Sequence, residues 1–192
     1  PRGSAGGRPR SIVPPAAASW ADLPASKPEP REPQGAADLG PIVAAIRRSD
    51  ERDEIVRLGC DAALTAGRSA VFLALRRGVL RGWEARGAGV SADAIRNLWL
   101  PASSPSMFKQ VLESGAPHEG AYGTTAADNL YRAATGSRGG RLSIQPVQVG
   151  GRIVALLCAD EVAFAEAGYE RIGVLAHAAG QAFKRLIVEQ KR

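Results

Sequence analysis

Cysteine and histidine are scarce in this chain of 192 residues, which holds two of each. Cys60 and Cys158 are far apart in the sequence and lie among apolar residues, so we expect two buried free thiols in a reducing compartment rather than a bridge. His118 and His177 are too few to build a metal site without further ligands beside them, so we expect no metal.

Long apolar runs are also missing. No stretch approaches the ~20 apolar residues that span a bilayer, so we expect no membrane insertion and a cytoplasmic location. The chain begins at Pro1 rather than at a methionine, which suggests a fragment or a processed product and leaves open whether a signal peptide preceded it.

A continuous basic stripe is absent, although the net charge is +6. The basic residues are mostly arginines, and they are scattered among carboxylates in short pairs such as Arg47 and Arg48. A nucleic-acid-binding face usually shows a basic stripe with interleaved aromatic residues or a known fold motif, and neither is present. We therefore expect an arginine-rich solvated surface and no nucleic-acid partner; the alternative, binding driven by charge, would weaken steeply with added salt.

Proline is concentrated at the beginning of the chain. Nine of the thirteen prolines lie in residues 1–41, together with runs of Gly, Ser and Ala and few large apolar residues. Such a segment cannot offset the backbone entropy lost on folding, about 1–2 kcal/mol per residue. We predict a disordered linker over residues 1–38 and one folded domain over residues 39–192.

The first half of the folded part predicts helices and a β-hairpin. Apolar residues recur at helical spacing over residues 39–66, where Ser49 or Asp50 is expected to cap a second helix that Gly67 ends. Two strands should follow, at residues 69–75 and 79–85, joined by a turn. The connection to the second half is predicted as a short helix at 92–98, an extended piece at 99–101, a helix at 107–113 capped by Ser104 or Ser106, an irregular or extended piece at 116–125 and a helical turn at 129–134.

The last quarter predicts a second hairpin and one long helix. Residues 141–149 alternate between apolar and polar, Gly150 and Gly151 suit a two-residue turn, and the apolar run 152–158 is typical of a central strand covered on both faces. A terminal helix should dock on the sheet through Ile172, Ala176, Ala179, Phe183 and Leu186.

A neighbouring face of this terminal helix carries small and polar residues, namely Gly173, His177, Gly180 and Lys184. Small residues allow another helix to approach closely, which favours a dimer contact and a role in transmitting a signal. Helix packing inside one molecule explains the two glycines equally well.

Several phrases, in this order, resemble the GAF domain family over residues 40–192. The most specific is an apolar-x-Pro-apolar segment followed by Gly and an apolar strand, matched by residues 144–147 and 151–157. The other matching phrases are residues 70–75, Arg86 and Gly87, Leu100 and Pro101, residues 111–117, and Phe164 with Glu166. The related PAS fold is the alternative, but it ordinarily ends on its sheet without pairing its first and last helices.

The resemblance implies an α+β fold: a central antiparallel sheet, the N- and C-terminal helices packed on one face and short crossover helices on the other. It also implies a small-ligand pocket on the crossover face. Apolar and aromatic residues line most such pockets, and a few polar groups orient the ligand. The candidate pocket residues are Phe72, Trp83, Trp99, Met107, Phe108, His118, Tyr122 and Tyr131; the alternative is that they fill the space without a cavity.

The known ligand signatures of the family are missing here. Cyclic-nucleotide-binding members have Asn-Lys where this chain has Asp160 and Glu161, and bilin-binding members use a pocket cysteine, whereas His118 has none beside it. Free methionine-sulfoxide reductases of this fold use cysteines in the crossover region, and none lies between Cys60 and Cys158. The sequence therefore names no cofactor.

These observations predict a non-catalytic regulatory module of a cytoplasmic signalling protein, dimeric and switched by a small ligand or by a partner through a population shift. The alternative is a degenerate module that docks a protein without a ligand. An enzyme on this fold is less favoured, because no sequence motif supports a catalytic group.

Overall fold

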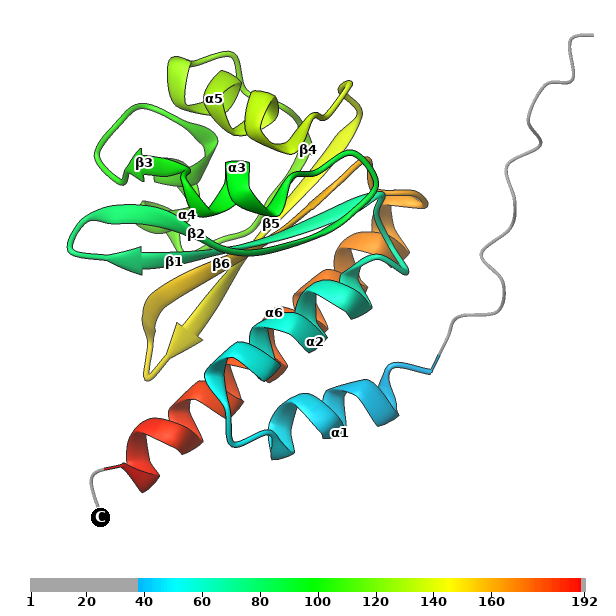
Figure 1. Ribbon diagram of the computed structural model, residues 1–192, viewed down its shortest axis with the longest axis vertical. Helices are drawn as coiled ribbons and strands as arrows, with labels where there is room; N and C mark the ends of the chain where they lie inside the picture. Colours follow the sequence, from blue (N-terminus) through cyan, green and yellow to red (C-terminus); the bar gives the residue numbers. More distant parts are fainter. Residues whose placement is uncertain (1–37, 191–192) are drawn as a thin grey trace, which may run out of the picture. The chain divides into compact units, whose positions relative to one another are not determined.

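The computed structural model describes residues 38–190 (Figure 1). The predicted linker over residues 1–38 lies outside the described residues except for Asp38. Six strands form one sheet in the order β3-β2-β1-β6-β5-β4, and every neighbouring pair is antiparallel. The strands are β1 Ser69–Arg76, β2 Val79–Gly87, β3 Trp99–Pro101, β4 His118–Ala121, β5 Arg141–Val149 and β6 Arg152–Asp160.

Helices cover both faces of the sheet, as Figure 1 shows. On one face α2 (Arg52–Ala63) and α6 (Ala165–Glu189) pack on the strands, and α1 (Gly40–Arg48) packs against these two helices. The other face carries the crossover helices α3 (Ala92–Arg96), α4 (Met107–Ser114) and α5 (Ala126–Thr135). The predicted α+β fold, with terminal helices on one face and crossover helices on the other, is confirmed.

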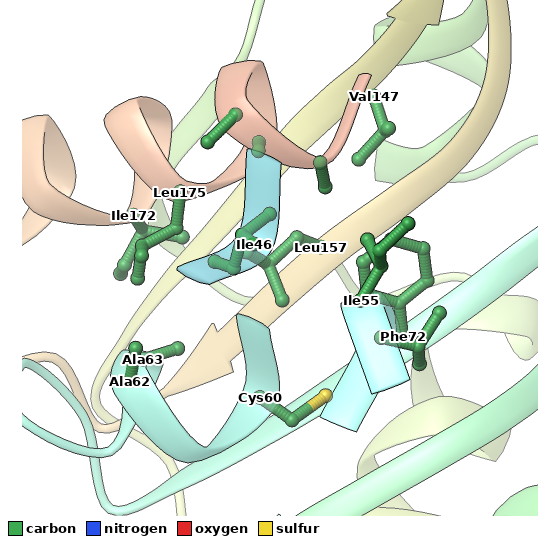
Figure 2. Packing of buried hydrophobic residues seen from close by; sticks show 14 of the residues in the cluster. Ile46, Ile55, Cys60, Ala62, Ala63, Phe72, Val147, Leu157, Ile172 and Leu175 are labelled. Atoms are coloured by element: carbon green, nitrogen blue, oxygen red, sulfur yellow. The ribbon is translucent and has the colours of Figure 1, made fainter. Parts of the chain in front are cut away.

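The central strands divide the apolar residues between two cores. Successive side chains of a strand point to opposite faces. In β1, Phe72 belongs to the core beneath the terminal helices, while its neighbours Val71 and Leu73 belong to the core beneath the crossover helices. Figure 2 shows the first core, where Ile46 of α1, Leu157 of β6 and residues of α2 and α6 meet. Each core buries one face of a single sheet.

The turn at Gly150 and Gly151 follows the predicted chemistry, and the turn at Arg77 and Gly78 has the same backbone form. Arg77 and Gly78 have φ values of 50° and 76°, and Gly150 and Gly151 have 57° and 78°. Positive φ at both central residues matches the right-handed twist of the flanking strands. The sequence predicted Ser104 or Ser106 as the cap of α4. Ser106 is the cap, and its side chain accepts a hydrogen bond from the Lys109 amide at 3.1 Å.

Some predicted helix ends are wrong. Glu51, not Ser49 or Asp50, is the N-cap residue of α2; the Ser49 hydroxyl donates to the Glu54 carboxylate at 2.6 Å, within the connecting turn. Helix α2 ends at Ala63, ahead of Gly67. Gly67 instead packs against strand β6, where an added Cβ would lie 2.8 Å from the Asp160 carbonyl oxygen.

Two elements of the crossover are longer or more regular than predicted. The segment at 116–125 contains the edge strand β4, and α5 starts three residues before the predicted helical turn. Both cysteines are buried and unbridged, as predicted. Within residues 38–190, no helix combines the length and apolar character needed to cross a membrane.

Candidate functional site

The crossover face carries a cavity of about 550 Å³, which we call the crossover pocket. It lies between the N-terminal ends of α4 and α5 and the edge strand β4. Its lining is mixed: the apolar part includes Met107 and Ala121, and polar side chains surround them. The polar lining residues are Ser106, Lys109, Gln110, Glu113, His118, Tyr122, Thr124, Thr125 and Asp128.

One buried carboxylate holds the two helices that form the pocket wall. Asp128 is 1% exposed and accepts hydrogen bonds from the Met107 amide at 3.0 Å and from the Thr125 amide at 3.1 Å. The Thr125 side chain in turn caps α5, forming a capping box with Asp128. Gly123 packs against this carboxylate so closely that an added Cβ would lie 2.0 Å from an Asp128 oxygen. The wall therefore has a fixed geometry.

The rim of the pocket offers polar groups of both kinds. His118 lies with its Nε2 atom 2.9 Å from the Ala121 carbonyl oxygen. Because a carbonyl can only accept, Nε2 donates, and the Nδ1 atom of the neutral ring is left as an acceptor. Lys109 forms an ion pair of 3.6 Å with the largely exposed Glu113 carboxylate, an arrangement that holds the ammonium only weakly. A polar ligand could therefore be met by a cation and by a hydrogen-bond acceptor.

Tyr122 connects the pocket to the interior of the sheet. Its hydroxyl donates to the Asp160 carboxylate at 2.5 Å. Asp160 is 1% exposed and also accepts from the Ser69 hydroxyl at 3.1 Å and from the Tyr131 hydroxyl at 3.4 Å. Burial raises the pKa of the Asp160 carboxyl above its ordinary value of 3.8, while these donors act in the opposite direction. Burial, together with the Asp160 charge, also raises the pKa of Tyr122.

Asp160 is the last residue of β6, immediately before the junction that leads into α6. Two junction residues, Glu161 and Phe164, have φ values of 50° and 52°. This left-handed region costs a non-glycine residue on the order of 1 kcal/mol. An ion pair of 2.9 Å between Glu161 and Arg68, and a backbone bond of 3.0 Å from Ala163 to Ala66, hold the junction in this conformation. The pocket thus reaches the start of the terminal helix through two side chains.

The eight predicted pocket residues do not share one cavity. Met107, His118 and Tyr122 line the crossover pocket. Phe108 and Tyr131 lie in the core beneath the crossover helices, with ring centroids 5.0 Å apart, and are at most 1% exposed. For these two rings, the alternative that they fill space holds.

Trp99 lies at the β3 edge of the sheet, outside the crossover pocket. It is 55% exposed on the edge strand β3, and the Arg81 guanidinium carbon lies 4.0 Å from the centroid of its ring. Together with Leu130, which is 49% exposed, it lines a separate apolar groove of about 450 Å³, which we call the edge groove.

Phe72 and Trp83 lie on the opposite face, so their prediction as crossover-face pocket residues is wrong. Phe72 alternates with Val71 and Leu73 along β1, and its position in this alternation places it beneath the terminal helices. Trp83 is the extra residue of a bulge in β2, because Phe72 pairs with Glu84 whereas Leu73 pairs with Gly82. Pattern alone gives no sign of that bulge.

The predicted transmission face of α6 lies along the border between its buried and exposed sides. His177 and Lys184 are exposed. Gly180 is buried, and an added Cβ would lie 2.4 Å from the Gln148 carbonyl oxygen of β5. Gly173 also faces β5, since its added Cβ would meet the Gln145 side chain at 3.5 Å. Gly180 thus allows α6 to approach β5 within one molecule, which was the alternative explanation, whereas Gly173 leaves room for a side chain.

Sequence reasoning missed the two buried carboxylates. The role of Asp128 could have been predicted from the sequence. Thr125 is followed three residues later by this acid, which is a capping-box pattern. Asp160 had only a weak signal, a charge directly after a buried strand. Its partner Tyr122 lies 38 residues away, in a segment without periodicity.

No family model matches the chain, and no curated protein matches it. Solved structures do match. A fragment of a methyl-accepting chemotaxis protein is 18% identical with a TM-score of 0.63, over 78% of this chain and 98% of that chain. The GAF-B domain of DevS from Mycobacterium smegmatis is 17% identical with a TM-score of 0.58, over 73% of this chain and 98% of that chain. The phycocyanobilin-bound GAF domain of a cyanobacterial phytochrome is 15% identical with a TM-score of 0.61, over 80% of this chain and 96% of that chain. The resemblance predicted from the sequence is confirmed at the level of the fold.

Proposed function

We propose that this GAF-like domain is a regulatory module of a signalling protein, which binds a small polar ligand in the crossover pocket. The observation that carries the proposal is the 2.5 Å hydrogen bond between Tyr122, a pocket-lining residue, and Asp160, the last residue before the α6 junction. Two of the similar structures support the setting, since one is part of a chemotaxis protein and one holds a bilin.

The size and chemistry of the pocket suit a small metabolite rather than a large chromophore. Its volume of about 550 Å³ lies within the ~300–1,000 Å³ of ordinary ligand sites. The apolar space that the aromatic residues could have left open is filled by Phe108 and Tyr131. The ligand must therefore bind near the polar rim, where Lys109 and the His118 Nδ1 atom are available.

Transmission follows from competition for the Tyr122 hydroxyl. A ligand that displaces Tyr122, or that strengthens its hydrogen bond to Asp160, alters the hydrogen bonding of a buried carboxylate at the end of β6. The adjacent junction has two residues in left-handed backbone that specific contacts hold, and we propose that a change at Asp160 lets it adopt a second conformation. The ligand then shifts the population between two positions of α6, by no more than its difference in affinity for them.

In our proposal the module is a homodimer in the cytoplasm. It turns over no substrate. The dimer would form through the exposed side of α6, where Val174 and Val188 are 41% and 47% exposed beside His177 and Lys184. Light scattering after size-exclusion chromatography tests the dimer, and a monomeric mass at all concentrations would refute it.

A second candidate function, docking of a protein partner, is favoured by the edge groove. Trp99 and Leu130 are large, apolar and about half exposed, and the groove lies beside a short edge strand. Exposed aromatic side chains are enriched among residues that anchor protein interfaces.

A matched pair of variants separates the two functions. Ala121 and Ala126 are both exposed alanines; the first lines the crossover pocket and the second lines the edge groove. Ala121→Trp fills the pocket, and Ala126→Trp fills the groove. Native mass spectrometry of freshly purified chain should show a retained small molecule in wild type and in Ala126→Trp, but not in Ala121→Trp. A clean unliganded mass in wild type, with partner binding lost only in Ala126→Trp, would favour docking and overturn the ligand proposal.

A further inference from the structure

The terminal-helix face carries a cavity of its own, about 190 Å³ in volume, which we call the helix-face groove. It lies between the C-terminal half of α6 and the ends of β1, β5 and β6, on the face of the sheet opposite to the crossover pocket. We infer that the helix-face groove is a binding site for a small aromatic carboxylate, such as a substituted benzoate or phenylacetate. This site is independent of the crossover pocket.

Aromatic rings form one wall of the groove. Trp83 of β2 and Phe183 of α6 are parallel within 5°, with ring centroids 5.9 Å apart, and are therefore offset rather than directly superposed. Phe72 meets both rings edge-on, at 6.0 and 6.1 Å. The Trp83 indole nitrogen donates to the Asp53 carboxylate at 2.8 Å, which fixes the orientation of the ring. A planar aromatic ligand finds here preformed partners for offset or edge-to-face stacking.

Two arginines stand at the rim of this wall. The Arg76 guanidinium carbon lies 6.0 Å from the Trp83 ring centroid, and none of the ion pairs in residues 38–190 includes Arg76. Arg52 donates to a neutral group, the Gln190 amide oxygen, at 3.0 Å. A guanidinium binds a carboxylate through two parallel hydrogen bonds, so Arg76 can hold an acid group above the apolar wall.

The size and polarity of the groove restrict the class of ligand further. A volume of about 190 Å³ is below the ~300 Å³ at which drug-sized sites begin, so the groove accepts about one ring. Its remaining wall is aliphatic, formed by residues such as Val149, Val154 and Ile187. A sugar or a free phosphate would leave its polar groups unpaired against this wall, which disfavours its binding. A planar ring with one carboxylate matches both the wall and the rim.

Binding in this groove would act on α6 directly. Phe183 and Ile187 belong to α6, whereas Trp83 and Val154 belong to strands of the two hairpins. A ligand between them adds apolar contacts that exist only while the C-terminal half of α6 lies on the sheet. It would therefore favour the docked position of that half of the helix.

The test uses phenylacetate as the probe, with the full chain and ligand-observed NMR. Phenylacetamide is the neutral control, and cyclohexylacetate is the non-aromatic one. Arg76→Gln should weaken phenylacetate binding by about tenfold or more, as expected for a lost charge-assisted hydrogen bond. Arg81→Gln is the matched control variant, since Arg81 is also an exposed arginine of the first hairpin over a tryptophan ring, but at Trp99 outside the groove.

We expect saturable binding of phenylacetate, weaker binding of both analogues, a loss in Arg76→Gln and no loss in Arg81→Gln. The inference is overturned if phenylacetate does not saturate, if phenylacetamide binds equally well, or if the two arginine variants weaken binding equally. Ala121→Trp should leave phenylacetate binding intact. If that variant abolishes it, the probe occupies the crossover pocket and the helix-face site is refuted, while the proposed function stands.

Discussion

Replacing Gly173 and Gly180 of α6 by alanine should change the stability of the chain in opposite directions. At Gly180 an added Cβ would lie 2.4 Å from the Gln148 carbonyl oxygen and 3.3 Å from the Gln148 amide nitrogen. At Gly173 the nearest atom is the Gln145 side-chain oxygen, at an ordinary contact distance of 3.5 Å. Both residues lie inside the same helix, so the change in helix propensity is the same for both.

The magnitudes follow from two opposing effects. Alanine is about 1 kcal/mol more favourable than glycine in a helix interior. At Gly173 nothing opposes this gain, so Gly173→Ala should stabilise the chain by about 0.5–1 kcal/mol. At Gly180 the obstructing atoms belong to the backbone of β5, and overpacking against them costs about 3 kcal/mol. Gly180→Ala should therefore destabilise the chain by about 2 kcal/mol net.

Urea unfolding followed by far-ultraviolet circular dichroism measures both changes. For a domain of this size, 1 kcal/mol corresponds to a shift of about 2–4 °C in Tm, so thermal unfolding gives a second readout. A shift of both midpoints in the same direction would refute the packing argument. If Gly180 instead served a contact between copies, Gly180→Ala would weaken association and leave the stability of the monomer unchanged.

Three further predictions concern the buried polar and thiol groups. Because burial raises the pKa of Asp160, the folded chain binds its proton more tightly; this stabilisation is full below the ordinary pKa of 3.8 and is lost as pH rises through the raised pKa. In Asp160→Asn, the free energy of unfolding should fall less steeply as pH rises across this range. Urea midpoints measure this fall, and an unchanged slope would contradict the prediction. Tyr122→Phe removes the 2.5 Å bond to Asp160 and should cost about 1.5–3 kcal/mol, whereas Tyr131→Phe, at 3.4 Å, should cost less than about 1 kcal/mol; equal losses in chemical denaturation would refute this ranking. Burial raises the pKa of Cys60 and Cys158, so a disulfide reagent should label neither thiol at neutral pH until the chain unfolds, and rapid labelling of native chain would show that one is accessible.

The sequence allowed most of the fold to be predicted, because its apolar residues repeat with the period of the element they belong to. The alternation in residues 141–149 and the stripe from Ile172 to Leu186 each specify one buried face. Turn residues such as Gly150 and Gly151 then fix where a strand reverses, since their positive φ is cheap only for glycine.

The candidate site was less predictable, because it depends on contacts between distant segments. Trp83 lies at a one-residue bulge on the terminal-helix face, and no local propensity marks the bulge. The link between Tyr122 and Asp160 joins an irregular loop to a strand end. Aromatic composition indicated where a pocket could form, but whether a ring fills the space, as Tyr131 does, depends on packing.

The carboxylate of Asp128 also has a consequence for how the crossover face opens. Since this one side chain accepts from the backbones at the start of α4 and at the start of α5, neither helix can fray at that end without breaking a bond that the other shares. The two helices should therefore unfold locally as one cooperative unit, with matching amide hydrogen-exchange protection in their first turns. A ligand in the crossover pocket, which lies against both helix starts, would slow exchange in the two together.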